Sequence, residues 1–184
     1  MHNEKIQIRE TTDADLNDIL FVQKAAFETD NEARLAAELL EDPTARPVIS
    51  LLALEDENPV GHILFSKARI EGYQGSEHVS LLTLLAVVSG RQRQDIGGFL
   101  IKEGLSRLKA NGVEMVFVLG DPDYYRQFGF VPEAESFGFT PPFPIPERNA
   151  EGWMVQALTI QGLSKSVGQF VCADALNKPE LWNI

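Results

Sequence analysis

The feature that most constrains this 184-residue chain is an apolar run that leads through a polar loop into a glycine-rich helix. Residues 81–88 are apolar except for one threonine, which is typical of a strand buried on both faces. The helix predicted from Ile96 carries Gly97, Ile101, Gly104 and Leu108 on one stripe. A glycine inside a helix costs about 1 kcal/mol relative to alanine. Two glycines on a buried stripe therefore predict a helix that lies very close to a sheet.

The start of this helix has the properties of an anion-binding site. Its first N–H groups lack helical partners, and the helix dipole favours negative charge there. Asp95 conflicts with such a site, because as an N-cap it would accept hydrogen bonds from Gly97 or Gly98, the donors that a phosphate needs. A like-charge contact at about 4 Å would cost up to roughly 4 kcal/mol. Arg91 and Arg93 are nearby cations that would offset part of this cost, and so would an outward turn of the Asp95 side chain, because Gly97 and Gly98 leave the backbone adaptable.

The remaining pattern predicts an α+β protein. A strand, two helices and a meander of antiparallel strands come first, followed by the glycine-rich helix, a central strand and a short helix that begins at Asp121-Pro122-Asp123. A stretch rich in proline and phenylalanine follows and is expected to be a loop of the same domain. Strands are expected at residues 6–9, 48–54, 60–70, 79–88, 113–119, 153–160 and 170–172.

Composition excludes several classes of protein. The net charge of −11 argues against a general binder of nucleic acids or anionic membranes and weakly favours a cationic ligand such as an amine. Cys172 is the only cysteine, so an intrachain disulfide and a cysteine-based metal site are excluded, and we expect no metal. The polar start lacks the apolar core of a signal peptide, and no apolar run is long enough to span a membrane. We therefore expect a cytoplasmic protein.

Two segments, in order, are similar to motifs of the GNAT family of acyl-CoA-dependent N-acetyltransferases. Gln92-Arg93-Gln94-Asp95-Ile96-Gly97 resembles the family pattern Gln/Arg-x-x-Gly-x-Gly/Ala, although Asp95 replaces a glycine. Gly120-Asp121-Pro122-Asp123-Tyr124-Tyr125-Arg126-Gln127-Phe128-Gly129-Phe130 resembles the ending Tyr-x-x-x-Gly-Phe, and in particular a subgroup of predicted small-molecule acetyltransferases. The resemblance covers about residues 6–131 of a single domain, 1–184, and is less specific over 132–184.

The resemblance implies the GNAT fold, which has a central mixed, mostly antiparallel sheet with helices on both faces. It also implies acetyl-CoA as co-substrate, with its pyrophosphate on residues 92–98. The edge of the preceding strand would pair with the amide-containing pantetheine arm, as an added strand would. The residues expected to bind acetyl-CoA are Leu85, Ala86, Val87, Gln92, Arg93, Gln94, Asp95, Ile96, Gly97 and Gly98.

Tyr125 is the candidate general acid under this resemblance. A phenol of pKa about 10 can share a proton with a leaving thiolate of pKa about 8.5 at little cost. The alternative is that Tyr124 and Tyr125 are packing residues of a short helix. No general base is assigned: Thr83 stands on the strand where many members have a glutamate, and His62 and His78 are expected to be ordinary polar residues at strand ends.

The expected function is transfer of an acetyl group from acetyl-CoA to an amine, more probably of a small molecule than of a protein, by a chain that family resemblance suggests is a homodimer. The alternative is a weakly active or inactive GNAT-like sensor that binds a CoA derivative or a partner.

Residues 137–146 either form a wall of the acceptor pocket or cover the sheet. The acids Glu28, Asp30 and Glu32 lie near the usual acceptor site of the family, but a solvated acidic turn is the favoured explanation for them.

Overall fold

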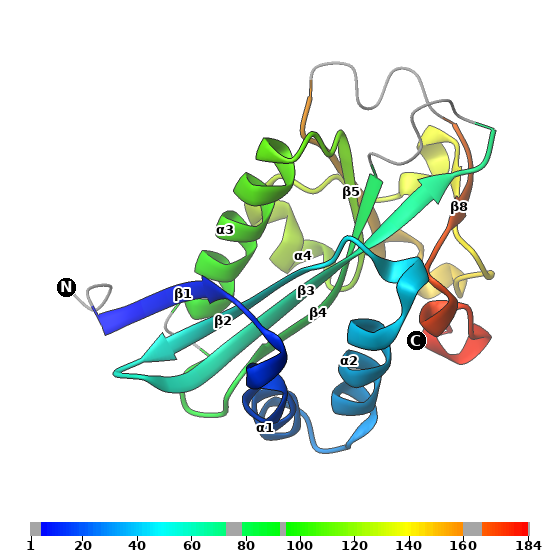
Figure 1. Cartoon of the computed structure of the whole chain (residues 1–184). Helices are drawn as coiled ribbons and strands as arrows, with labels where there is room; N and C mark the ends of the chain where they lie inside the picture. The colour runs from blue at the N-terminus through cyan, green and yellow to red at the C-terminus, as the bar shows by residue number, and fades with distance from the viewer. Residues whose placement is uncertain (1–4, 73–78, 93–94, 160–166, 184) are drawn as a thin grey trace.

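The computed structural model describes residues 5–72, 79–92, 95–159 and 167–183, which form a sheet with helices on both faces (Figure 1). Helices α1 and α2 cover one face and α3 covers the other. The predicted fold class is therefore confirmed. The elements are β1 (Ile6–Glu10), α1 (Leu16–Ala26), α2 (Asn31–Glu41), β2 (Ile49–Glu55), β3 (Asn58–Ile70), β4 (Val79–Val87), α3 (Ile96–Ala110), β5 (Met115–Leu119), α4 (Pro122–Tyr125), β6 (Phe139–Thr140), β7 (Trp153–Ala157) and β8 (Gly168–Val171), with short 3-10 helices between several of them.

The strands of the sheet lie in the order β1-β2-β3-β4-β5-β7, and β8 pairs with β3 and with β6. Along the main path only β4 and β5 are parallel, because α3 crosses over between them, and the other neighbours are antiparallel. Within the described residues, no helix has both the length and the apolar character that crossing a bilayer requires. The predicted mixed, mostly antiparallel sheet is thus confirmed.

Strand ends differ from the predictions by a few residues. The strand predicted from residue 113 begins at Met115, and the one predicted from Trp153 to Ile160 ends at Ala157, while Ile160 lies outside the described residues. The short strand β6 was not predicted, because two residues are too few to show a period.

The stretch 137–146 covers the sheet. Phe139 is fully buried and its carbonyl accepts a hydrogen bond of 3.0 Å from the indole N–H of Trp153, while Phe143 and Ile145 pack against the same core. Of the two alternatives for this stretch, these contacts favour the covering loop. The aromatic residues that share this core are Phe117, Phe139, Trp153, Phe170 and Trp182.

Helix α3 approaches the sheet closely at its glycines, as predicted. A methyl group added at Gly104 would overlap the ring of Phe65, which is fully buried on β3. On the sheet side, a methyl group at Gly61 would lie 3.0 Å from side-chain atoms of both Ile96 and Leu100. The absence of these methyl groups lets the backbone of α3 settle onto β3.

Three buried polar side chains form a hydrogen-bonded row between α1 and the sheet. Gln23 on α1 donates a hydrogen bond of 2.9 Å from Nε2 to Nδ1 of His62, whose Nε2 lies 2.9 Å from Oγ of Ser50. His62 is fully buried within β3, so the prediction of a polar residue at a strand end was wrong for this histidine. An alternating strand can carry a polar residue inward when it finds partners on both ring nitrogens, and no local pattern reveals those partners.

The first prediction concerns Gly104. Overpacking a core costs about 1–3 kcal/mol, whereas alanine gains about 1 kcal/mol over glycine in a helix. Because the Phe65 ring is enclosed, we expect Gly104→Ala to lower the free energy of unfolding in urea. Ser106→Ala, at an exposed position of the same helix, is the control and should change it by no more than about 0.5 kcal/mol. A stabilised Gly104→Ala protein would contradict the close approach.

The second prediction concerns pH. Burial lowers the pKa of His62 to about 3, while an unfolded histidine has a pKa of about 6.5. Between these values the unfolded chain binds the extra proton, so stability falls as the pH decreases through this window. From pH 7.5 to 5 the loss attributable to His62 should be about 2 kcal/mol in urea unfolding. The imidazole resonances of His62 in the folded protein should stay constant over that range, and a titration near pH 6.5 would contradict the burial.

Candidate functional site

The site begins where β4 separates from β5. The last paired residues of the two parallel strands are Leu82 and Val118, yet β4 continues to Val87. On this side no described strand pairs with residues 83–87, so their backbone polar groups line an opening in the sheet. Such an edge can accept an extended, amide-containing ligand as an added strand.

Two adjoining hollows lie along this edge and the start of α3, and we call them together the β4–α3 groove. They share the residues Gln92, Gly97 and Tyr124. The first, of about 210 Å³, adds Ala26, Phe27, Leu85, Ala86 and Val87. The second, of about 320 Å³, adds Asp95, Gly98, Phe99, Lys102, Gln127 and Phe128.

Most residues predicted to bind the cofactor line this groove. Leu85, Ala86 and Val87 line the first hollow, Asp95 and Gly98 the second, and Gln92 and Gly97 both. Ile96 does not contribute its side chain, which is fully buried beside Gly61 of β3. Arg93 and Gln94 lie outside the described residues. The side chain of Gln92 donates a hydrogen bond of 3.1 Å to the carbonyl of Val87, which ties the loop to the end of the strand.

Asp95 does not cap α3 as predicted. It occupies the N-cap position, but its backbone is left-handed, with φ 60° and ψ 13°, and its exposed side chain makes no capping hydrogen bond. A capping side chain requires an extended backbone at this position, which directs the carboxylate back over the first turn. Asp95 therefore leaves the first-turn donors uncapped, although its charge still lines the groove.

The charges around the helix start also differ from the prediction. Arg91 forms an ion pair of 2.6 Å with Glu55, which commits it to the β2–β3 turn rather than to Asp95. Lys102, which was not predicted, lines the second hollow together with Gly98 and Asp95. The spacing i, i+4 between Gly98 and Lys102 places them on one helix face, so the sequence did contain a signal for this lysine.

The two neighbouring tyrosines occupy different places. Tyr124 lines both hollows, and a methyl group on Gly97 would lie 2.6 Å from its hydroxyl. Tyr125 packs against Gly120 and makes an edge-on contact with Phe130, with ring centroids 5.8 Å apart. Burial raises the pKa of both phenols, with a smaller contribution from Asp95 for Tyr124. Both therefore hold their protons throughout the neutral range.

A third hollow, of about 360 Å³, lies at the carboxyl end of β5. Its lining includes Gly120, Asp121, Arg148 and Glu151, and Gly120 places it directly behind the ring of Tyr125. Asp121 uses one carboxylate oxygen to cap α4, accepting a hydrogen bond of 3.0 Å from the N–H of Asp123. The hollow thus brings two acids and one base close to the second motif.

Comparison with known proteins decides the family. A family model described as an acetyltransferase (GNAT) domain matches residues 7–132. The chain belongs to the GNAT acetyltransferase family. It is 43% identical over 164 residues to an uncharacterized N-acetyltransferase of Escherichia coli K12, YjhQ, covering 89% of this chain and 90% of that protein.

Solved structures of GNAT proteins share this architecture. The crystal structure of the GNAT N-acetyltransferase YhbS from Escherichia coli in complex with CoA superposes with a TM-score of 0.84 at 27% identity, covering 95% of this chain and 93% of that one. A GNAT acetyltransferase from Brucella melitensis in complex with acetyl-CoA gives a TM-score of 0.73 at 28% identity, covering 93% and 97%. The predicted GNAT fold is confirmed.

The third prediction isolates the charge of Asp95. Asn tolerates a left-handed backbone but carries no charge, so Asp95→Asn removes only the electrostatic term. If a pyrophosphate lies at the start of α3, we expect this variant to bind CoA about fivefold more tightly at low salt, which corresponds to about 1 kcal/mol. The gain should shrink at high ionic strength, because salt screens exposed charges. Calorimetric titration with CoA measures both effects.

Two further variants serve as controls. If only the charge of Asp95 matters, the gain in CoA affinity should be the same for Asp95→Gly as for Asp95→Asn. If the left-handed backbone also contributes, the gain should be larger for Asp95→Gly. Lys102→Gln removes the opposite charge from the same hollow and should weaken CoA binding. Unchanged CoA affinity in both Asp95 variants would show that the Asp95 side chain does not influence CoA binding.

Proposed function

We propose that this protein transfers an acetyl group from acetyl-CoA to the amine of a small molecule, and that acetyl-CoA binds in the β4–α3 groove. The observation that carries the proposal is the groove itself, which joins an unpaired strand edge to an uncapped helix start. The pantetheine arm has amides for the strand edge, and the pyrophosphate has the charge for the helix start. The relatives solved with CoA or acetyl-CoA support this assignment.

The proposed binding residues follow from the lining of the groove. Leu85, Ala86 and Val87 would hold the pantetheine arm, and residues 92–98 the pyrophosphate, with Arg93 and Gln94 retained from the sequence motif. Lys102 adds a charge-assisted contact to the phosphates that the motif alone does not include. Its charge opposes that of Asp95, so the second hollow contains one charge of each sign among its described residues.

In the reaction, the amine nitrogen attacks the thioester carbon, a carbon–nitrogen bond forms and the carbon–sulfur bond breaks. N–H groups of the strand edge would stabilise the oxyanion. A cationic acceptor first loses a proton to water to become the attacking amine, and after the attack its nitrogen gives a second proton to water. The departing thiolate takes a proton from a phenol, for which we propose Tyr125, and the phenolate regains a proton from solvent. Tyr124 competes for the acid role because its hydroxyl lies in the groove.

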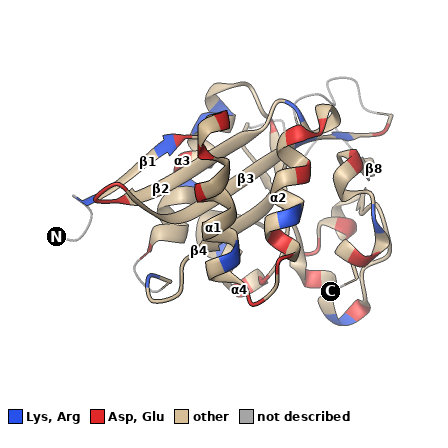
Figure 2. Cartoon of the chain, turned by 60° about the horizontal axis from the view of Figure 1, so that its bottom comes forward, with Lys and Arg blue, Asp and Glu red and all other residues tan. Residues whose placement is uncertain are grey.

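The acceptor is proposed to be a cationic amine. Phe27, which lines the first hollow, is followed at once by the acidic connection between α1 and α2, visible in red in Figure 2. Glu28 and Asp30 in this connection are exposed, and among the described residues the Asp30 carboxylate has a single ion pair, a long one of 3.9 Å with Lys24. Acids at the mouth of the groove would concentrate a positively charged substrate.

Four further expectations complete the proposal. We propose that the Gly-Asp-Pro and double-tyrosine segment marks a subgroup that acts on small molecules, and that the chain functions in the cytoplasm. The whole chain, 1–184, acts as one domain, which is supported by the pairing of β7 with β5 and by Trp182 packing on Trp153. A homodimer remains a prediction that light scattering of the purified protein can measure.

A second candidate function is a sensor that binds CoA without turnover. It is favoured by the described lining of the groove, in which Asp95 is the only carboxylate and no imidazole is present. Thr83 is hydrogen-bonded to Ser66. His62 is buried, with Gln23 and Ser50 hydrogen-bonded to its two ring nitrogens, so neither Thr83 nor His62 offers a base. Tight CoA binding with no thiol release across a panel of small amines would favour the sensor.

The fourth prediction separates the two tyrosines. Tyr125→Phe should lower kcat for thiol release about 10²-fold or more, since a general acid typically contributes 10²–10⁴-fold. Tyr124→Phe should mainly raise KM for acetyl-CoA, because its hydroxyl lines the groove. Both are measured as acetyl-CoA-dependent thiol release with the best amine of the panel. The reverse pattern would move the acid role to Tyr124, and full activity in both variants would exclude a tyrosine acid.

A further inference from the structure

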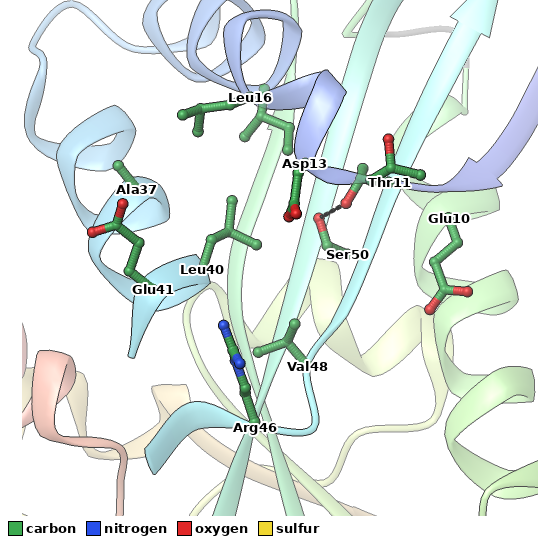
Figure 3. A pocket seen from close by; sticks show the side chains of 12 residues that line it. Glu10, Thr11, Asp13, Leu16, Ala37, Leu40, Glu41, Arg46, Val48 and Ser50 are labelled. Atoms are coloured by element: carbon green, nitrogen blue, oxygen red, sulfur yellow. Dashed lines mark hydrogen bonds between the residues drawn. The ribbon is translucent and has the colours of Figure 1, made fainter. Parts of the chain in front are cut away.

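A separate cavity lies at the opposite end of α1 from the β4–α3 groove. It has a volume of about 390 Å³, is open to solvent on one side and is lined by the end of β1, the start of α1, the end of α2 and the start of β2 (Figure 3). We call it the α1–α2 cavity. The groove instead contacts Ala26 and Phe27, one helix length away, which is about 15 Å for α1. The volume falls within the range of small-ligand pockets, about 300–1,000 Å³.

Apolar side chains form much of its lining. Leu40 of α2 and Val48, just before β2, face the middle of the cavity, and Leu16 stands at its rim (Figure 3). Leu16 is 39% exposed, which is high for a leucine that begins a core helix. This apolar lining can receive an aliphatic group of a ligand. Ile19 and Ala37 complete it.

Two opposite charges point into the cavity from its two ends. Asp13 reaches in from the start of α1 and Arg46 from the segment before β2, with Leu40 and Val48 between them (Figure 3). Both side chains are exposed at the surface, and within the part of the chain that the structure describes neither has a hydrogen-bond or ion-pair partner. Elsewhere in that part several basic side chains do pair with acids, as Arg9 does with Asp15 at 2.8 Å.

The wall of the cavity beside Asp13 is held in place by the row of buried polar side chains described above, which ends at Ser50. Thr11 donates a hydrogen bond of 2.8 Å to Oγ of Ser50, and both residues line the cavity. Because Gln23 can only donate from Nε2, His62 accepts at Nδ1 and donates from Nε2 to the same oxygen. Ser50 thus accepts from two donors, and its own O–H is free to donate to a ligand in the cavity.

The charges select the class of ligand. Asp13 and Glu41 oppose a simple carboxylate, and Arg46 opposes a simple amine. A molecule with both an ammonium and a carboxylate can pair with Asp13 and Arg46 at once, and an aliphatic side chain fits the apolar lining. Guanidinium–carboxylate contacts are among the stronger polar contacts that proteins make.

We propose that the α1–α2 cavity binds a small aliphatic amino acid, with its carboxylate on Arg46, its ammonium on Asp13 and its side chain over Leu40 and Val48. This site is distinct from the groove in which acetyl transfer is proposed. Its occupancy does not depend on CoA chemistry, so either proposal can fail without the other.

The test uses the full chain and L-leucine as the probe. Calorimetry and two-dimensional NMR, without acetyl-CoA, should show saturable binding with shifts at Thr11, Asp13 and Ser50. Two molecules that each lack one charge, 3-methylbutylamine and 4-methylpentanoate, should bind roughly tenfold more weakly or worse. Arg46→Gln and Asp13→Asn should each weaken leucine binding by roughly tenfold as well.

Arg34→Gln is the matched control, because it makes the same change at an exposed position of α2 outside the cavity lining. It should leave leucine affinity unchanged, and all variants should bind CoA as the parent does. Absence of saturable leucine binding, or equal affinity in Arg46→Gln, would overturn the proposal. Acetylation of leucine at a rate that Arg46→Gln leaves unchanged, with no shifts at Thr11 or Ser50, would place leucine in the groove and would also overturn it.

Discussion

The unequal lengths of β4 and β5, which leave the last five residues of β4 without a described partner strand on that side, are the constraint on which the rest of this structure depends. Two parallel neighbours that stay paired along their whole length would leave no strand edge inside a sheet. Here the pairing ends at Leu82 and Val118 while β4 continues, and the start of α3 closes the far side of the gap. Everything assigned to the β4–α3 groove follows from that opening, because a strand edge and a helix start offer unpaired backbone donors in one place.

Much of this arrangement could be predicted from the sequence. The glycine stripe of α3 predicted its close approach to the sheet, and the ordered pair of motifs predicted the fold. The residues that were not predicted lie beyond the motifs or make contacts with residues that are distant in the sequence. Lys102 lies a helical turn beyond the motif, Tyr124 depends on its contact with Gly97, and His62 is buried because Gln23 and Ser50 supply its partners. No local pattern contains the contacts of Tyr124 and His62, since tertiary packing creates them, whereas the i, i+4 spacing from Gly98 did contain a signal for Lys102.

Asp95 illustrates the same limit at a single residue. Composition and position correctly suggested an N-cap, but capping depends on the backbone angle as well as on the side chain. A left-handed backbone at Asp95 turns the carboxylate away from the donors, so a residue that would close the helix start leaves it open. The charge still matters to an anionic ligand, although it acts through space and not by occupying the donors.

The contact between Gly97 and Tyr124 has a consequence for how the two motifs can change. One residue opens α3 and the other lies on α4, yet the gap between the backbone of the first and the hydroxyl of the second is too small for a methyl group. The positions are therefore sterically linked: a chain with alanine at 97 needs a smaller or displaced side chain at 124. Exchanging either motif alone with that of another GNAT protein would bring mismatched surfaces together, so the two segments are expected to be transplanted, or to evolve, as a pair.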